Sequence, residues 1–100
     1  MAAFEEHVRR ALDSLPPDLA AALENVAVVV EDEHPDDPDL FGLFEEEPFL
    51  PAKVTIFRLP LAETFPDPRE LEHEIRVTVL HELAHYFGID EERLDELGFG

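Results

Sequence analysis

The sequence predicts an α+β fold, because hydrophobic residues follow two different periods in separate parts of the chain. Apolar residues recur at helical spacing near the N-terminus and again between Leu71 and Phe87. Between these parts, the runs Val26 to Glu31 and Lys53 to Arg58 are rich in β-branched residues, which is typical of strands. A chain of 100 residues carries one hydrophobic core, so a single domain over residues 1–100 is expected.

The N-terminal quarter is predicted to form two short helices. The first carries its apolar residues on one stripe and is stopped by Pro16 and Pro17; the stripe consists of Phe4, Val8, Ala11, Leu12 and Leu15. The second helix starts near Leu19, with the prolines at its entry and Asn25 near its end. The Pro- and Asp-rich stretch after the first strand is expected to be a solvated loop, in which Leu40 to Phe44 forms a short strand or hairpin arm.

A long helix is predicted to start after Asp67, which can accept hydrogen bonds as N-cap, with Pro68 at the first helical position. Its second half is apolar on two sides, so it must run through the core; the two stripes are Leu71, Ile75, Val79 and Leu83, and Val77, Leu80, Ala84 and Phe87. Gly88 can adopt the left-handed conformation that ends a helix. Asp90 can then cap a final short helix that continues to Leu97.

The charge balance argues against two classes of partner. The chain has 25 Asp and Glu residues against 7 Lys and Arg, a net charge of -18, and such a surface repels nucleic-acid phosphates and anionic lipids. No apolar run approaches the roughly 18 residues that span a bilayer, and none at the N-terminus resembles a leader, so a cytoplasmic location is expected. Cysteine is absent, so any metal ligand must be a His, Asp or Glu.

The motif that carries chemistry is His81-Glu82-Leu83-Ala84-His85, an HExxH arrangement on the long helix. Residues four apart lie on one helix face, so both imidazoles can bind the same zinc ion. Glu82 is then placed to act as general base on zinc-bound water, which attacks a carbonyl. The other histidines carry no such pattern: His7 and His73 lie among charged residues and are expected to be solvated, and His34 is expected to be a loop residue.

The chain resembles the small bacterial zincin-like metallopeptidase family. The resemblance rests on HELAHYFGIDEERLDELG from His81 to Gly98 and on VTIFRLPLAETF from Val54 to Phe65, and it extends to FEEHVRRALDSLP, VAVVVE and LFGLFE. It implies a minimal zincin-like fold, in which a small mixed sheet packs on the active-site helix and a short C-terminal helix follows. It also implies Zn²⁺ as cofactor and a peptide or protein as substrate.

The third metal ligand is expected to be an acid after Gly88. HELAHYFGIDE also resembles HExxHxxGxx(H/D), in which the third ligand follows the second His by six residues, and here that position is Glu91. Asp90 is the expected helix cap, which counts against it. Asp95 and Glu96 lie further into the final helix and would reach the metal only if the two helices pack closely. Glu91 is therefore favoured over Asp90 and Asp95.

Two functions fit this sequence. In the first, the protein is a zinc metallopeptidase, and the strand Lys53 to Arg58 lies at the sheet edge and aligns an extended peptide. The acidic surface then predicts basic or neutral substrates, captured less well as salt rises. In the alternative, the protein is a zinc-binding interaction domain without proteolytic activity. A closed site with four protein ligands favours the second function, and an open site favours the first.

Overall fold

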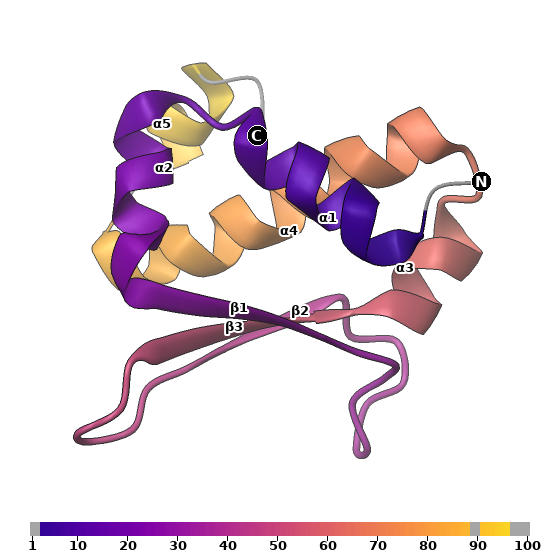
Figure 1. Ribbon diagram of the computed structural model, residues 1–100, viewed down its shortest axis with the longest axis horizontal. Coiled ribbons are helices and arrows are strands. Elements are labelled where there is room, and N and C mark those ends of the chain that lie inside the picture. The colour runs from indigo at the N-terminus through magenta and orange to yellow at the C-terminus, as the bar shows by residue number, and fades with distance from the viewer. Residues whose placement is uncertain (1–2, 89–90, 97–100) are drawn as a thin grey trace.

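The computed structural model describes residues 3–88 and 91–96, and it confirms the α+β class. Helices α1 (Phe4–Asp13) and α2 (Pro17–Ala22) and the 3₁₀ turn η1 (Leu23–Asn25) precede strand β1 (Val26–Glu31). Strands β2 (Gly42–Glu45) and β3 (Ala52–Phe57) follow, then helices α3 (Arg58–Thr64), α4 (Pro68–Phe87) and α5 (Glu91–Glu96). The strands pass beneath the helices, and both interstrand loops project away from the helical layer (Figure 1).

The sheet is mixed, and β3 is its central strand. The strand order is β1-β3-β2, with β1 parallel and β2 antiparallel to β3. The expectation that this segment lies at the sheet edge is therefore wrong. The physical reason is visible in its burial: Val54, Thr55 and Ile56 are all 1% exposed or less, so the strand is covered on both faces. The edge strand that contacts the long helix α4 is β2 instead.

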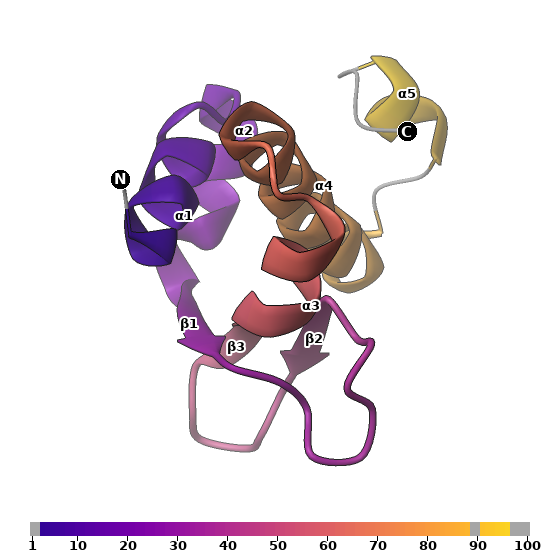
Figure 2. The same ribbon diagram turned by 90° about the vertical axis from the view of Figure 1, so that its right-hand side faces the viewer.

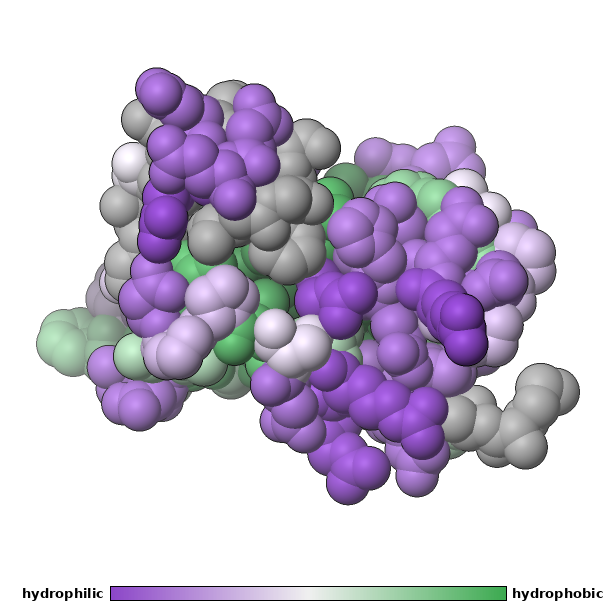
Figure 3. Space-filling model, turned by 90° about the horizontal axis from the view of Figure 1, so that it is seen from above, coloured by the Kyte–Doolittle hydropathy of each residue, from purple (hydrophilic) through white to green (hydrophobic). Residues whose placement is uncertain are grey.

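The core lies between the sheet and the two longest helices. Helices α1 and α4 pack side by side over one face of the sheet (Figure 2). The predicted apolar stripes supply this core, whose members include Phe4, Val8, Ala11, Val54, Ile56, Leu61, Leu71, Ile75, Val79 and Leu83. Outside it, hydrophilic residues cover most of the face seen in Figure 3. No helix in the described part of the chain is long and apolar enough to cross a membrane.

Helix α4 begins and ends where the sequence predicts. The Asp67 carboxylate accepts hydrogen bonds from the backbone N–H groups of Arg69 at 2.9 Å and Glu70 at 3.3 Å. Gly88 has φ 68°, the left-handed conformation that stops the helix. Helix α3 was not predicted, because its start follows β3 without a loop and contains Pro60. Proline is tolerated there, since the first-turn N–H groups of a helix have no partner inside the helix.

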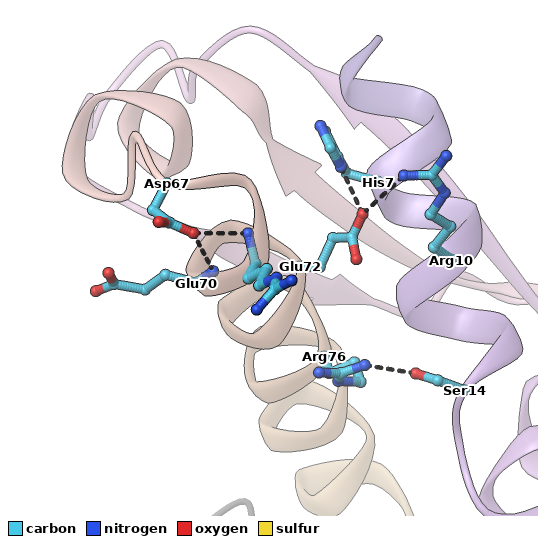
Figure 4. Close-up of polar contacts among 8 residues, drawn as sticks. His7, Arg10, Ser14, Asp67, Glu70, Glu72 and Arg76 are labelled. Carbon is cyan, nitrogen blue, oxygen red and sulfur yellow. Dashed lines mark hydrogen bonds and ion pairs between the residues drawn. The ribbon is translucent and has the colours of Figure 1, made fainter. Parts of the chain in front are cut away.

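His7 is buried, so the expectation that it is solvated is wrong. Its side chain lies between α1 and α4, where Nδ1 donates to Oε1 of Glu72 at 2.7 Å (Figure 4). Arg10 approaches the same oxygen at 3.4 Å. The hydrogen bond from His7 is the main cause that holds the pKa of Glu72 below its ordinary value of 4.5. The ionised carboxylate therefore ties the two core helices together.

Replacing Glu72 with Gln is expected to lower the free energy of unfolding by about 1 kcal/mol at neutral pH, because a charge-assisted hydrogen bond is lost. The folded-state pKa of Glu72 is depressed, so its stabilisation is complete above the unfolded value and is lost as pH falls through the folded value. The difference between wild type and variant should therefore shrink below pH 4.5. Urea unfolding at several pH values measures it.

The matched control is Glu63→Gln, which removes the same charge from an exposed position on α3. This variant should keep the wild-type pH dependence. If both variants lose the same stability at every pH, the contribution of Glu72 is a general charge effect and not its bond to His7.

Candidate functional site

The HExxH motif lies near the C-terminal end of α4, in a helix that continues without a break from Pro68 to Phe87. The backbone of His81 and that of His85 are therefore one helical turn apart on the same face. The side chains of His81 and Glu82 are half-buried. The side chains of His85 and Glu91, and the whole of Asp90, lie outside the described part of the structure.

A cleft of about 400 Å³ opens beside the motif. One wall is a face of α4, and the other is formed by the end of the β1–β2 loop and the start of β2. The loop and β2 contribute Asp37, Asp39, Leu40, Phe41 and Gly42, and α4 contributes Glu74, Val77, Thr78, His81 and Glu82. The structure thus brings His81 and Glu82 together on one cleft wall. The acidic loop is exposed as predicted, but sequence reasoning missed that two of its aspartates reach this cleft.

Local contacts hold this acidic loop in place. His34 and Asp37 form an isolated β-bridge, and Nδ1 of His34 accepts from the backbone N–H of Asp36 at 3.1 Å. The His34 ring meets Phe57 edge to face, with centroids 5.8 Å apart. The first two contacts lie within the loop and the third joins the loop to β3, and the position of His34 agrees with its interpretation as a loop residue.

Gly42 allows the loop and β2 to approach α4 closely. A Cβ atom at this position would lie 2.6 Å from Cγ2 of Thr78 and 3.3 Å from the backbone oxygen of Thr55. Thr78 cannot easily move away, because it is buried and its hydroxyl donates to the backbone oxygen of Glu74 at 2.8 Å. Glu82 is the next neighbour, with Cγ 3.7 Å from the same point. The close approach of β2 to α4 beside Glu82 therefore depends on Gly42 having no side chain.

Replacing Gly42 with Ala is expected to lower the free energy of unfolding by about 1 to 3 kcal/mol, the usual range for overpacking a tight contact. The added methyl overlaps Cγ2 of Thr78 and must separate β2 from α4. Guanidinium unfolding measures the loss.

The companion variant is Thr78→Ser, which removes Cγ2 and keeps the hydroxyl that bonds to Glu74. In the double variant the clash is absent, so the two changes should show a favourable coupling energy. Additive losses would mean that the backbone oxygen of Thr55, and not the Thr78 methyl, limits the space at Gly42.

Beyond the cleft, Phe44 of β2 stacks on Tyr86 of α4 with ring centroids 4.8 Å apart and an interplanar angle of 30°. Tyr86 directly follows His85 in the sequence and remains 42% exposed. This aromatic pair holds the edge strand β2 against the C-terminal end of α4. The contacts of β2 with α4 at Gly42 and at Phe44 therefore flank the motif.

The donor set at the motif suits zinc. Two histidine positions share one helix face and a carboxylate lines the adjoining cleft, which is the combination of nitrogen and oxygen donors that zinc accepts. Among the side chains that the structure describes, no three His, Asp or Glu residues gather around one point. His85 and Glu91 lie outside that set.

Helix α5 follows the motif and carries the other acidic candidates. Asp95 is exposed, and Glu96 forms an ion pair of 3.6 Å with Arg93 in the same helix. Arg93 also donates to Asp18 at 2.9 Å, which links α5 to α2. Glu91 is the first residue of α5, so it is the residue of this helix that follows α4 most closely in the sequence.

Comparison with known proteins identifies the family of this chain. A search of curated proteins finds no significant match. The family model for zincin-like metallopeptidases matches residues 23–100, which include the sheet, the cleft and the HExxH helix. The match begins at Leu23, so the resemblance of the segment Phe4 to Pro16 stays a prediction. The chain belongs to the zincin-like metallopeptidase family.

Proposed function

We propose that this protein is a zinc-dependent peptidase in which His81, His85 and Glu91 bind the metal and Glu82 is the general base. The observation that supports this most is that His81 and Glu82 line one open cleft beside an edge strand. An open cleft gives a substrate access to the motif, which a structural zinc site does not need.

Zinc, when bound, supplies a Lewis acid that acidifies water and polarises a peptide carbonyl. The chain contributes the proton transfers. Glu82 takes the proton of the attacking water and returns it to the amine that leaves. Its half-buried position against Gly42 restricts the side chain, so the carboxylate is held for this transfer with little loss of conformational freedom.

Strand β2 is the better candidate for aligning a substrate. It is the last strand on its side of the sheet, it contacts α4, and its first residue lies in the cleft wall. An extended peptide can add to such an edge through main-chain hydrogen bonds. This role replaces the one expected for the segment Lys53 to Arg58, whose backbone is already paired on both sides.

The test of this function is zinc content followed by peptide cleavage. The purified chain should bind one zinc ion, and it should cleave members of a fluorogenic peptide library. Chelation should stop the cleavage and added zinc should restore it. A chain that binds zinc tightly, cleaves no peptide and holds the metal with four protein ligands would instead be a zinc-binding interaction domain.

Substrate capture is expected to favour basic peptides and to weaken with salt. Asp37, Asp39 and Glu74 line the cleft together with Glu82, and the whole chain carries a net charge of -18. Long-range attraction of this kind is screened as the Debye length falls from about 10 Å at 0.1 M salt to about 3 Å at 1 M. Raising salt over this range should lower kcat/KM for a Lys-rich peptide by about tenfold.

The control peptide replaces each Lys with Gln, and its kcat/KM should change little with salt. Neutralising the cleft with Asp37→Asn and Asp39→Asn should reduce the salt dependence for the Lys peptide. A preference for acidic peptides that persists at all salt concentrations would contradict this electrostatic account.

A further inference from the structure

The loop between β2 and β3 presents apolar side chains to solvent at its tip, which we define as Glu46 to Leu50. Phe49 is 104% exposed and Leu50 is 61% exposed. The loop projects away from the helical layer (Figure 1). A phenyl ring with this exposure buries no area against the fold, so hydrophobic stabilisation of the chain does not explain its presence.

The backbone at Phe49 is also unusual. The N–H of Leu50 donates to the backbone oxygen of Glu47 at 3.2 Å, which closes a turn with Pro48 and Phe49 at its centre. Phe49 has φ 70°, and among the described residues it is the only one besides glycine with a positive φ. Proline followed by a residue of positive φ is the pattern of a type II turn, in which glycine or asparagine is preferred at the second position. The turn therefore holds an aromatic ring out to solvent at a cost in backbone strain, which is typical of functional positions.

Carboxylates lie next to the apolar residues of the tip. Glu46 and Glu47 are exposed and directly precede the turn. A hollow of about 80 Å³ at the base of the turn combines apolar and charged walls, which come from Leu50, Pro51, Glu45, Glu47 and Lys53. The surface is therefore complementary to a partner that carries an apolar side chain beside a Lys or Arg.

The tip continues the line of the candidate cleft. Edge strand β2 starts in the cleft wall at Gly42 and leads directly into the β2–β3 loop. Phe44 stacks on Tyr86, so this strand lies beside the end of α4 that carries the HExxH motif. Seven residues separate Gly42 from Phe49, a span of at most about 25 Å. An extended peptide of about ten residues that pairs with β2 is therefore long enough to reach from the cleft to the tip.

We propose that the tip is an exosite that holds an extended polypeptide substrate beyond the cleft, a proposal that rests on the peptidase function proposed above. An apolar residue of the substrate packs on Phe49 and Leu50, and a neighbouring Lys or Arg pairs with Glu46 or Glu47. The substrate class is therefore a long or unfolded polypeptide with mixed apolar and basic residues, since a peptide of a few residues in the cleft cannot reach the tip.

The test is fluorescence anisotropy with three labelled peptides that carry the same charge. The first has a pair of serines at each end of a central segment in which Lys and Thr alternate. The two anchored peptides replace either the C-terminal or the N-terminal serine pair with Phe and Leu. The full chain is used as the Glu82→Gln variant, so that bound peptides are not cleaved. At least one anchored peptide should bind about tenfold more tightly than the first, because its apolar side chains leave water at the tip.

Variants in the same background locate the binding surface. Glycine is favoured at position 49 of the turn, so Phe49→Gly should be about as stable as its parent in urea unfolding. It should nevertheless remove most of the preference for the anchored peptide. Replacing both Glu46 and Glu47 with Gln should weaken all three peptides by about two- to fivefold. The matched control replaces Glu5 and Glu6, which are exposed on α1, with Gln and should leave binding unchanged.

The outcomes separate this exosite from the peptidase function. Equal binding of the three peptides, or a preference for an anchored peptide that survives Phe49→Gly, would overturn the exosite, while cleavage of short peptides by the wild-type chain would still support the peptidase. Conversely, an anchor preference that Phe49→Gly removes, in a chain that cleaves no peptide, would support the tip as a polypeptide-binding surface and contradict only the peptidase function.

Discussion

Replacing Glu82 with Gln is expected to lower kcat/KM for peptide hydrolysis by about 1,000-fold while the protein still binds zinc. The amide keeps the size of the side chain and its fit against Gly42, but it cannot accept a proton from water. The loss should appear in kcat, because the missing interaction belongs to the transition state. Zinc affinity is measured separately by competition with a chelator.

The matched control is Glu74→Gln, which removes a carboxylate from the same cleft wall two turns earlier on α4. This change should alter KM for basic peptides and leave kcat nearly unchanged, because Glu74 contributes charge and not proton transfer. If Glu82→Gln loses its zinc, then Glu82 is a ligand and the proposed base is wrong.

Helix α4, which carries the HExxH motif, could be predicted because its signals are local. Asp67 caps it within three residues, Gly88 ends it, and the apolar stripes between them have the period of a helix. The HExxH spacing places both histidines on one face if the helix is continuous, and the same local residues predict that it is. His81 and Glu82 were therefore placed on one helix by the sequence alone, and the structure adds that both line a cleft.

The strand order could not be predicted from such local signals. The segment Lys53 to Arg58 has the pattern of a strand, but nothing within it distinguishes an edge strand from a central one. In the structure, Lys53 near the start of β3 reaches Glu45 at 3.7 Å, and Arg58, the first residue of α3, reaches Asp32 at 2.7 Å, so the strand residues between them carry no charge. The pairing that makes β3 central joins residues far apart in the chain, such as Val28 with Val54. Long-range pairing of this kind has no signature within one segment.

The cleft wall formed by the β1–β2 loop and the start of β2 could not be predicted from the sequence either. The Asp-rich loop has the composition of any solvated connection, and only its return to β2 brings Asp37 and Asp39 next to α4. Gly42 likewise looks like a turn residue, whereas its function is to leave room for Thr78. The burial of His7 depends on Glu72, which is distant in sequence, so a charged neighbourhood in α1 gave the wrong expectation.

Replacing Glu91 with Ala is expected to weaken zinc binding by more than about 100-fold, because a direct ligand matters at least as much as the outer partners whose loss costs about 10- to 100-fold. The reason for choosing Glu91 lies in the chain path. Helix α4 ends at Gly88 in a left-handed turn, and α5 begins at Glu91, six residues after His85. Zinc affinity at pH 7 by chelator competition measures the effect.

The competing acids provide the controls. Asp95→Ala and Glu96→Ala should leave zinc affinity nearly unchanged, since Asp95 is exposed and Glu96 pairs with Arg93 at 3.6 Å. Asp90→Ala should reduce stability through loss of the expected helix cap, by about 1 kcal/mol, and should affect zinc much less than Glu91→Ala. If Asp95→Ala or Asp90→Ala causes the larger loss of zinc, the third ligand is that residue, and the six-residue spacing after His85 does not determine the site.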